Sequence, residues 1–76
     1  MYTKFNDMYS GGSKKTDYEA IFIELPLEKA VEYFEEAFDL DSNNVTCECC
    51  GPDFYIYEVD APNEKGNILV ITKDNL

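Results

Sequence analysis

The sequence predicts an α+β fold in which one amphipathic helix packs on a small, mostly antiparallel sheet of three or four strands. Apolar residues recur at helical spacing from residue 27 to residue 38. Three other runs, residues 18–24, 54–59 and 68–72, have the β-branched and aromatic composition of strands. A chain of 76 residues is short enough that we expect residues 1–76 to form a single domain around one core.

The N-terminal segment, residues 1–17, contains two clusters of turn residues, at positions 6–7 and 10–13. Two structures fit this segment: a loose arm, or the first strand of a hairpin. The side chains that would pack in such a hairpin are Tyr2, Phe5, Met8 and Tyr9. The next run, residues 18–24 (YEAIFIE), is β-branched and aromatic, and we expect it to be a strand.

A helix is predicted from Leu27 to Phe38. Pro26 suits its first turn, because the missing N–H of proline would have no partner there. Glu28 also lies in the first turn, where a negative charge complements the helix dipole. The polar run at residues 41–44 ends the helix. The apolar stripe consists of Leu27, Ala30, Val31, Phe34 and Phe38.

We expect strands 54–59 and 68–72 to pair as an antiparallel hairpin, because a loop of turn residues separates them. Both strands are apolar on two faces, whereas one helix covers only one face of a sheet. The second face must therefore be closed by the N-terminal segment, by a second copy of the chain or by a partner. Tyr55 and Tyr57 suit a partner interface, since tyrosine is amphipathic and easy to order.

The chain is strongly acidic, with 16 aspartates and glutamates against 6 lysines, no arginine and a net charge of −10. Such a surface repels nucleic acid and anionic lipid, and it attracts basic patches on other proteins. Solubility is the simpler explanation of the same excess. No apolar run approaches the roughly 20 residues of a membrane span, and the N-terminus lacks the apolar core of a signal peptide. We therefore expect a cytosolic protein that contacts neither membrane nor nucleic acid directly.

The acids of the predicted helix share the face opposite its apolar stripe. Glu28, Glu32 and Glu36 are four residues apart, which places successive charges about 6 Å from each other along the axis. Like charges at this spacing cost a few tenths of a kcal/mol per pair, and the helix contains only one lysine, Lys29, to offset them. A basic partner and a solvated face explain this row equally well. The candidate partner-binding acids are Glu28, Glu32, Glu35, Glu36 and Asp39, which Asp41, Glu58 and Asp60 can extend.

Three thiols, Cys47, Cys49 and Cys50, lie in the run TCECC, and the chain has no other cysteine and no histidine. A structural zinc site needs a fourth ligand, which here would have to be Glu48, Asp53 or a residue of a second chain. A redox pair is normally activated by a cation or a helix N-terminus, whereas these two acids would raise a thiol pKa. We expect reduced, structural thiols that pack beneath the sheet as small apolar groups, with no metal and no cofactor.

Catalysis finds little support in the sequence. Histidine and arginine are absent, and no glycine-rich phosphate loop or nucleophile with a recognisable base is present. The acid pairs lie on a convex helix face, where nothing would separate their pKa values into an acid and a base. We therefore expect that the protein is not an enzyme.

The segment NNVTCECCGPDFYIYE resembles the pattern N-V-T-C-x-C-C-G-x-D-[FY] of small uncharacterised bacteriophage proteins, in which the pattern follows an acidic amphipathic helix. The resemblance covers roughly residues 27–58. It implies a phage or mobile-element origin and brings no known catalytic or binding residues.

With such an origin we expect a non-enzymatic inhibitor in the host cytoplasm. Its target would be a host defence protein with a basic nucleic-acid-binding surface, such as a CRISPR effector, and carboxylates would stand in for phosphates. The alternative is a small metal-binding or dimerising structural protein with no defence role.

Overall fold

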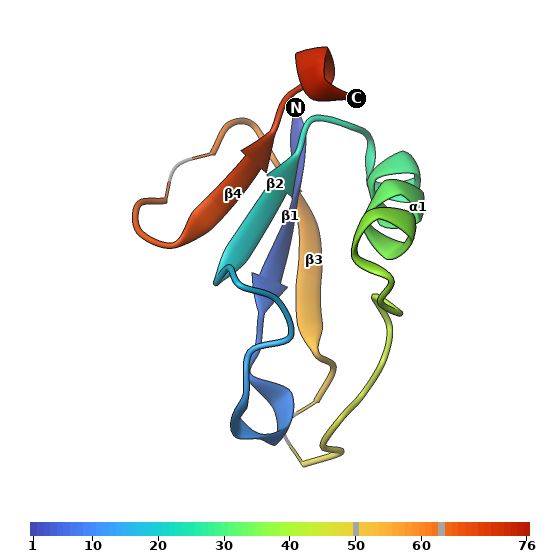
Figure 1. The fold of residues 1–76 in the computed structure, drawn as a ribbon, viewed down its shortest axis with the longest axis vertical. Coiled ribbons are helices and arrows are strands. Elements are labelled where there is room, and N and C mark those ends of the chain that lie inside the picture. The colour runs from blue at the N-terminus through green and yellow to red at the C-terminus, as the bar shows by residue number, and fades with distance from the viewer. Residues whose placement is uncertain (50, 63) are drawn as a thin grey trace.

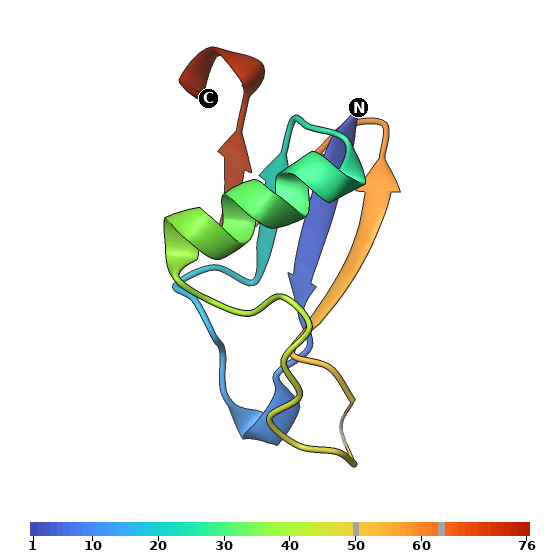
Figure 2. The same ribbon diagram turned by 90° about the vertical axis from the view of Figure 1, so that its right-hand side faces the viewer.

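The computed structural model describes residues 1–49, 51–62 and 64–76, and its four strands form one sheet in the order β3-β1-β2-β4 (Figure 1). Helix α1 packs on one face of this sheet (Figure 2). The predicted α+β class, one helix on a small sheet, is confirmed. In chain order the elements are β1 (Tyr2–Asp7), the 3₁₀ turn η1 (Ser10–Gly12), β2 (Ala20–Ile23), α1 (Leu27–Phe38), β3 (Phe54–Val59), β4 (Ile68–Ile71) and the 3₁₀ turn η2 (Lys73–Asn75).

Strand β1 occupies the middle of the sheet and is antiparallel to both of its neighbours. Its Phe5 lies opposite Ile21 of β2 on one side and Ile56 of β3 on the other. Residues 2–7 therefore form a strand rather than a loose arm. The connection to β2 contains η1, and the backbone N–H of Asp7 donates to the carbonyl of Glu19 where the two strands meet, at 3.0 Å.

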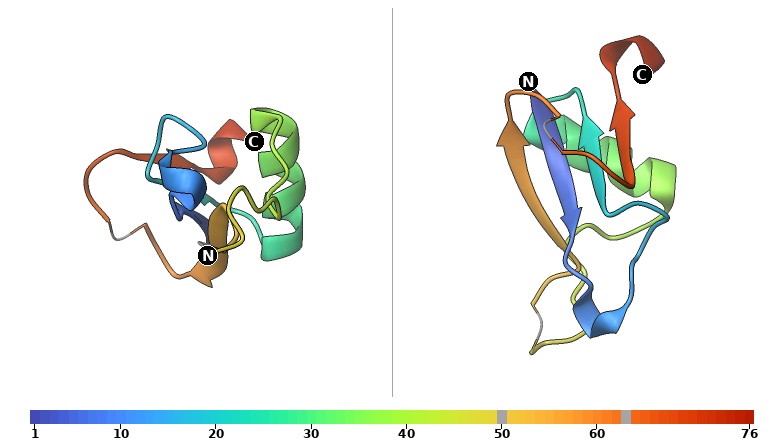
Figure 3. Two further views of the ribbon diagram at one scale, coloured as in Figure 1. Left: turned by 90° about the horizontal axis from the view of Figure 1, so that it is seen from below. Right: turned by 90° about the vertical axis from the view of Figure 1, so that its left-hand side faces the viewer.

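The predicted hairpin between residues 54–59 and 68–72 is wrong. Strands β3 and β4 lie at opposite edges of the sheet, and β4 pairs in parallel with β2. The described residues of the connection, 60–62 and 64–67, pass over the face that α1 leaves uncovered (Figure 3). The connection must cross three strand spacings and also return along about four residues of strand, because β3 and β4 run in the same direction. This path needs roughly 20 Å, and a connection of this length can reach about 25 Å. Its length therefore permits a crossover as well as a hairpin.

The core lies between α1 and the sheet, and Phe34 is at its centre. This ring stacks on Phe5 with 4.3 Å between ring centroids, and it meets Phe54 edge-on at 5.0 Å. The expected apolar stripe of the helix faces the sheet, with Phe34 fully buried and Phe38 half-buried beside it. Leu27 departs from the expectation, because 37% of its surface is exposed at the first turn.

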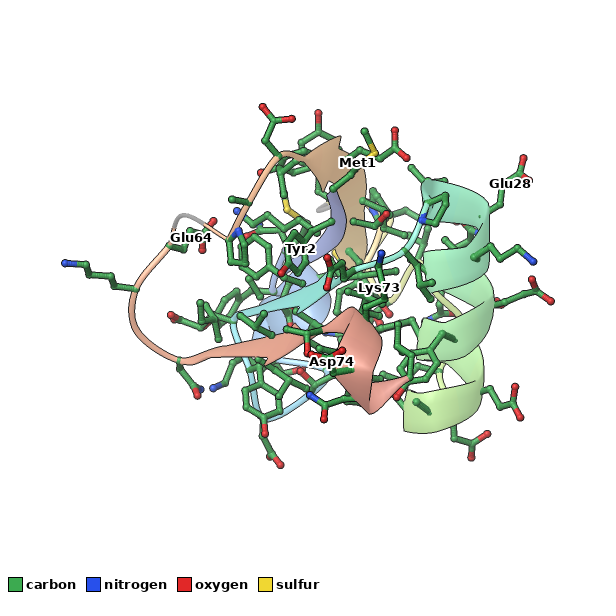
Figure 4. All side chains as sticks on the ribbon, turned by 90° about the horizontal axis from the view of Figure 1, so that it is seen from above. Met1, Tyr2, Glu28, Glu64, Lys73 and Asp74 are labelled. Carbon is green, nitrogen blue, oxygen red and sulfur yellow. The ribbon has the colours of Figure 1, made fainter. Side chains whose placement is uncertain are left out.

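The second face of the sheet is covered in part by residues 60–62 and 64–67 of the connection, and not by the N-terminal segment. Lys4 of β1 is 6% exposed on this face and pairs with Glu64 of the connection. Its ammonium lies 5.7 Å from the ring centroid of Phe22 and 5.5 Å from that of Tyr57. In Figure 4, Glu64 lies on the far side of the sheet from Glu28 of α1. The Lys4 side chain thus lies over the buried Phe22, and Glu64 of the crossover pairs with this lysine.

Candidate partner-binding surface

The outer face of α1 presents carboxylates to solvent. Glu28, Glu32, Glu36 and Asp39 are all exposed, and Figure 4 shows Glu28 pointing away from the sheet. Within the described residues the one ion pair is that of Lys4 with Glu64, so no lysine neutralises these four acids. We name this group, Glu28, Glu32, Glu36 and Asp39, the acidic face.

Glu35 differs from its neighbours on the helix. It is half-buried, and its Oε2 accepts hydrogen bonds from both the backbone N–H and the hydroxyl of Ser42, each at 2.9 Å. The Ser42 side chain is itself buried. Glu35 therefore holds the segment after the helix against α1, which leaves it less available to a partner than the acidic face.

Acidic residues lie together at the C-terminal end of α1, where the helix dipole makes a negative charge unfavourable. Asp39 adopts the left-handed conformation at the C-cap, with φ of 53°, and the last turn contains no basic residue. Asp39 and Asp41, together with Glu35 and Leu40, line a shallow recess at this end. A negative charge near a helix C-terminus opposes the dipole, and a non-glycine residue in this conformation is strained. The arrangement costs stability, and it creates a local negative potential.

Of the three acids expected to extend the row, Glu58 has an internal role. Its Oε2 accepts the backbone N–H of Leu27 at 3.2 Å, so it caps the N-terminus of α1 from strand β3. Asp41 and Asp60 are exposed, and Asp41 also accepts the backbone N–H of Asn43 at 2.9 Å. The expected extension of the row therefore loses Glu58, whereas Asp41 and Asp60 are exposed to solvent.

Tyr55 and Tyr57 lie on the sheet face opposite α1. Their ring centroids are 4.9 Å apart, Tyr55 is 60% exposed, and Tyr57 is half-buried beside Lys4. The two groups of expected partner-binding residues are consequently on opposite sides of the molecule. One flat partner surface cannot contact both groups at once.

The cysteine loop, which consists of residues 44–49 and 51–53 in the described chain, lies beyond the end of the sheet, against η1 (Figure 2). Cys47 is half-buried, and its backbone forms an isolated antiparallel β-bridge with that of Gly51. Cys49 is exposed, and Cys50 lies outside the described residues. The expectation that the thiols pack beneath the sheet is therefore wrong for Cys49. Among the described residues, no group of three or more histidines, cysteines or acids is placed to hold a metal ion.

Ser10 joins η1 to the cysteine loop, a role that the sequence analysis missed. Its buried hydroxyl accepts the backbone N–H of Cys47 and donates to the carbonyl of Gly51, both at 3.0 Å. Gly11 packs so closely on the loop that a Cβ there would lie 2.8 Å from the Thr46 methyl group, and its φ is +74°. The adjacent Ser-Gly-Gly was the available signal, because such a run favours a tight turn and close backbone approach.

Asp53 organises the loop from its other end. The residue is 4% exposed, and its carboxylate accepts hydrogen bonds from the Asn44 side-chain amide at 2.9 Å and the Thr46 backbone N–H at 3.0 Å. Burial raises the pKa of the Asp53 carboxyl, but these hydrogen bonds outweigh burial and the net pKa is lowered. The Asn, Thr, Gly and Asp positions of the N-V-T-C-x-C-C-G-x-D segment therefore have structural roles in this loop.

A scan against protein-family models, a search of curated proteins and a search of solved structures each found no match. The helices of the described residues include none with the length and apolar character needed to cross a membrane.

Proposed function

We propose that this protein is a non-enzymatic inhibitor of phage origin that acts in the host cytoplasm. In this proposal it binds a host nucleic-acid-binding defence protein, such as a CRISPR effector, through the acidic face of α1. The observation that carries the proposal is the exposure of four helix carboxylates that no lysine of the described chain neutralises. A basic cleft that normally receives phosphates offers such carboxylates the counter-charges that they lack.

The spacing of the charges limits what the acidic face can imitate. The Glu28–Asp39 row is about 17 Å long and carries four exposed carboxylates, whereas a duplex of equal length carries about ten phosphate charges. The face is therefore too sparse to replace a DNA duplex. It suits competition for a small cluster of arginines and lysines, where a few desolvated charge pairs can dominate affinity.

The energetics of α1 support binding rather than solubility as the reason for this row. Glu28, Glu32 and Glu36 repel one another at four-residue spacing, and Asp39 opposes the dipole at the helix C-terminus. Solubility needs negative charge somewhere on the surface, and it does not require the charge at these costly positions. A binding surface, in contrast, requires negative charge at the positions that the partner contacts.

The proposal is tested by comparing two triple variants of equal net charge. One replaces Glu28, Glu32 and Glu36 with glutamine. Its control replaces three exposed acids away from α1, namely Asp17→Asn, Glu48→Gln and Asp74→Asn. The partner is recovered from host lysate with the wild-type protein, purified, and titrated with all three proteins at low and high salt.

We expect wild-type affinity to fall steeply with salt, and the helix variant alone to lose both affinity and salt slope. A loss of about 2–5 kcal/mol is expected for each fully desolvated pair. Equal losses of affinity in both variants would show that binding depends on the total negative charge, and they would contradict the proposal that the acidic face is the binding site. An unchanged affinity in both variants would also contradict the proposal that the acidic face is the binding site.

The metal-binding alternative has a direct measurement. We expect elemental analysis of the purified protein to find no stoichiometric zinc, because the described residues supply no metal-ligand cluster. About one zinc per chain, or per two chains, would favour the alternative over the inhibitor.

A further inference from the structure

Strand β3 forms an edge of the sheet that lacks the usual protection against strand pairing. It has six residues, FYIYEV, with no proline and no lysine, and its register with β1 is unbroken. Natural edge strands are normally short, charged, bulged or covered. The single charge of β3, Glu58, is turned to the N-terminus of α1, which lies over the face of the sheet and not along this edge.

The direction of the backbone groups of β3 follows from its pairing with β1. The Met8 N–H donates to the Asp53 carbonyl at 2.9 Å, and 8↔53 continues the observed register. Hydrogen-bonded pairs alternate in an antiparallel ladder, so the backbone groups of Tyr55 and Tyr57 also turn to β1. Those of Phe54, Ile56 and Glu58 consequently point outward at the free edge.

We propose that this edge pairs with the same edge of a second copy, antiparallel and about a two-fold axis at Ile56. The outward N–H and C=O groups of Ile56 then bond to Ile56 of the second copy, and those of Phe54 bond to Glu58. Tyr55 falls opposite Tyr57 of the second copy on the face away from α1. The pair of rings already in contact in each copy becomes a ladder of four, and the exposure of Tyr55, 60% in a single copy, falls.

The pairing partner is a second copy because β3 is complementary to itself in this register. Apolar and aromatic residues face one another at residues 55–57, and Glu58 faces Phe54 rather than another Glu58. Like charges directly opposite each other, which destabilise a strand pair, are therefore avoided, and aromatic cross-strand pairs stabilise it. The strand directs no charge to its edge that would select a basic or acidic strand from another protein. A two-fold interface uses the same patch on both subunits, which is what this edge offers.

The dependence on salt distinguishes self-association through β3 from partner binding through the acidic face. Each copy carries a net charge of −10, so two copies repel each other, and salt screens that repulsion. Self-association through β3 should therefore strengthen as salt rises. Binding of a basic partner to the acidic face should weaken under the same change.

Sedimentation and amide hydrogen exchange on the purified full chain test the pairing together. We expect a concentration-dependent monomer–dimer equilibrium that shifts to dimer in high salt. As concentration rises, the amides of Phe54, Ile56 and Glu58 should exchange about tenfold more slowly or slower still. The Tyr55 and Tyr57 amides, which are already bonded to β1, serve as the internal control and should stay protected throughout.

Two charge-matched variants complete the test. Tyr55→Glu places a charge in the proposed tyrosine ladder, whereas Val45→Glu adds the same charge at a residue that is 46% exposed in the cysteine loop. We expect the first to weaken dimerisation at least tenfold and the second to change it little.

A monomer at every concentration and salt would overturn the proposal. So would a dimer in which the Phe54, Ile56 and Glu58 amides still exchange fast. Protection of these amides only after a host protein is added would also overturn it, because a foreign strand would then occupy the edge.

Discussion

Lys4 and Glu64 form an ion pair across the face of the sheet that α1 leaves uncovered. The two side chains are unequal, since that of Lys4 is 8% exposed and that of Glu64 is 37% exposed. The lysine comes from the central strand and the glutamate from the crossover, so this pair fastens the crossover to the sheet. The rings of Phe22 and Tyr57 flank the ammonium and supply cation–π contacts.

The unequal burial predicts unequal effects of removing each partner. Glu64→Ala leaves a buried ammonium without its carboxylate and should lower the free energy of unfolding by about 1–3 kcal/mol. Lys4→Met keeps the apolar stem, and the released Glu64 can be solvated, so the loss should be smaller. Urea unfolding of the two variants measures the difference. Equal losses, or a larger loss for Lys4→Met, would contradict this account of the pair.

Phe34→Ala should destabilise the fold by about 3–5 kcal/mol, because it removes the ring at the centre of the core. Phe38 is half-buried, so Phe38→Ala should cost less. Leu27→Ala, at the exposed first turn, is the control and should change stability little. Thermal melts of the three variants should follow this order. A melt of Phe34→Ala that matches the wild type would refute the packing of helix on sheet.

Asp39→Gly should stabilise the protein by about 1 kcal/mol. Glycine relieves the left-handed strain at φ of 53° and removes a negative charge from the helix C-terminus. Glu36→Gln is the matched control, since it removes a charge from the same turn without altering backbone strain. If Asp39→Gly raises the free energy of unfolding by more than Glu36→Gln does, the difference is the contribution of backbone strain. A destabilised Asp39→Gly would show that the aspartate has a favourable contact at this cap.

Asp53 should make stability depend on pH under acidic conditions. Its pKa is lower in the folded protein than in the unfolded chain, so it contributes stability above the unfolded value of about 3.9. That contribution is lost as pH falls through the lower, folded pKa. Denaturant unfolding of the wild type and Asp53→Asn across this window should show a weaker acid dependence for the variant. Asp60→Asn, an exposed control, should keep the wild-type profile.

The elements of this fold could be predicted from sequence better than their arrangement. Helix 27–38 and strand 54–59 have the predicted bounds, because apolar periodicity and strand composition are local properties. Strand order is set by which elements bury surface together, and a loop of residues 60–67 is compatible with both a hairpin and a crossover. The central place of β1 was hidden because its Lys4 is a charged residue, and the carboxylate that pairs with it when it is buried belongs to Glu64, sixty positions away.

The candidate surface was predictable to the same degree. Helical spacing alone places Glu28, Glu32 and Glu36 on one exposed face. The same spacing could not show that Glu35 is engaged by Ser42, or that Glu58 caps α1, because these contacts depend on the tertiary fold. Internal contacts thus reduce the acids available for binding to fewer than the helical pattern suggests.

The position of β1 also has a consequence for synthesis on the ribosome. This strand is translated before both of its neighbours, and its longer ladder, with β3, cannot form until residue 59 has emerged from the exit tunnel. Phe5 and the rest of the central strand stay without that partner while β2 and α1 are made. The sheet can therefore close only after β3 and β4 have been made, and its assembly depends on contacts between residues far apart in the chain, which slow folding.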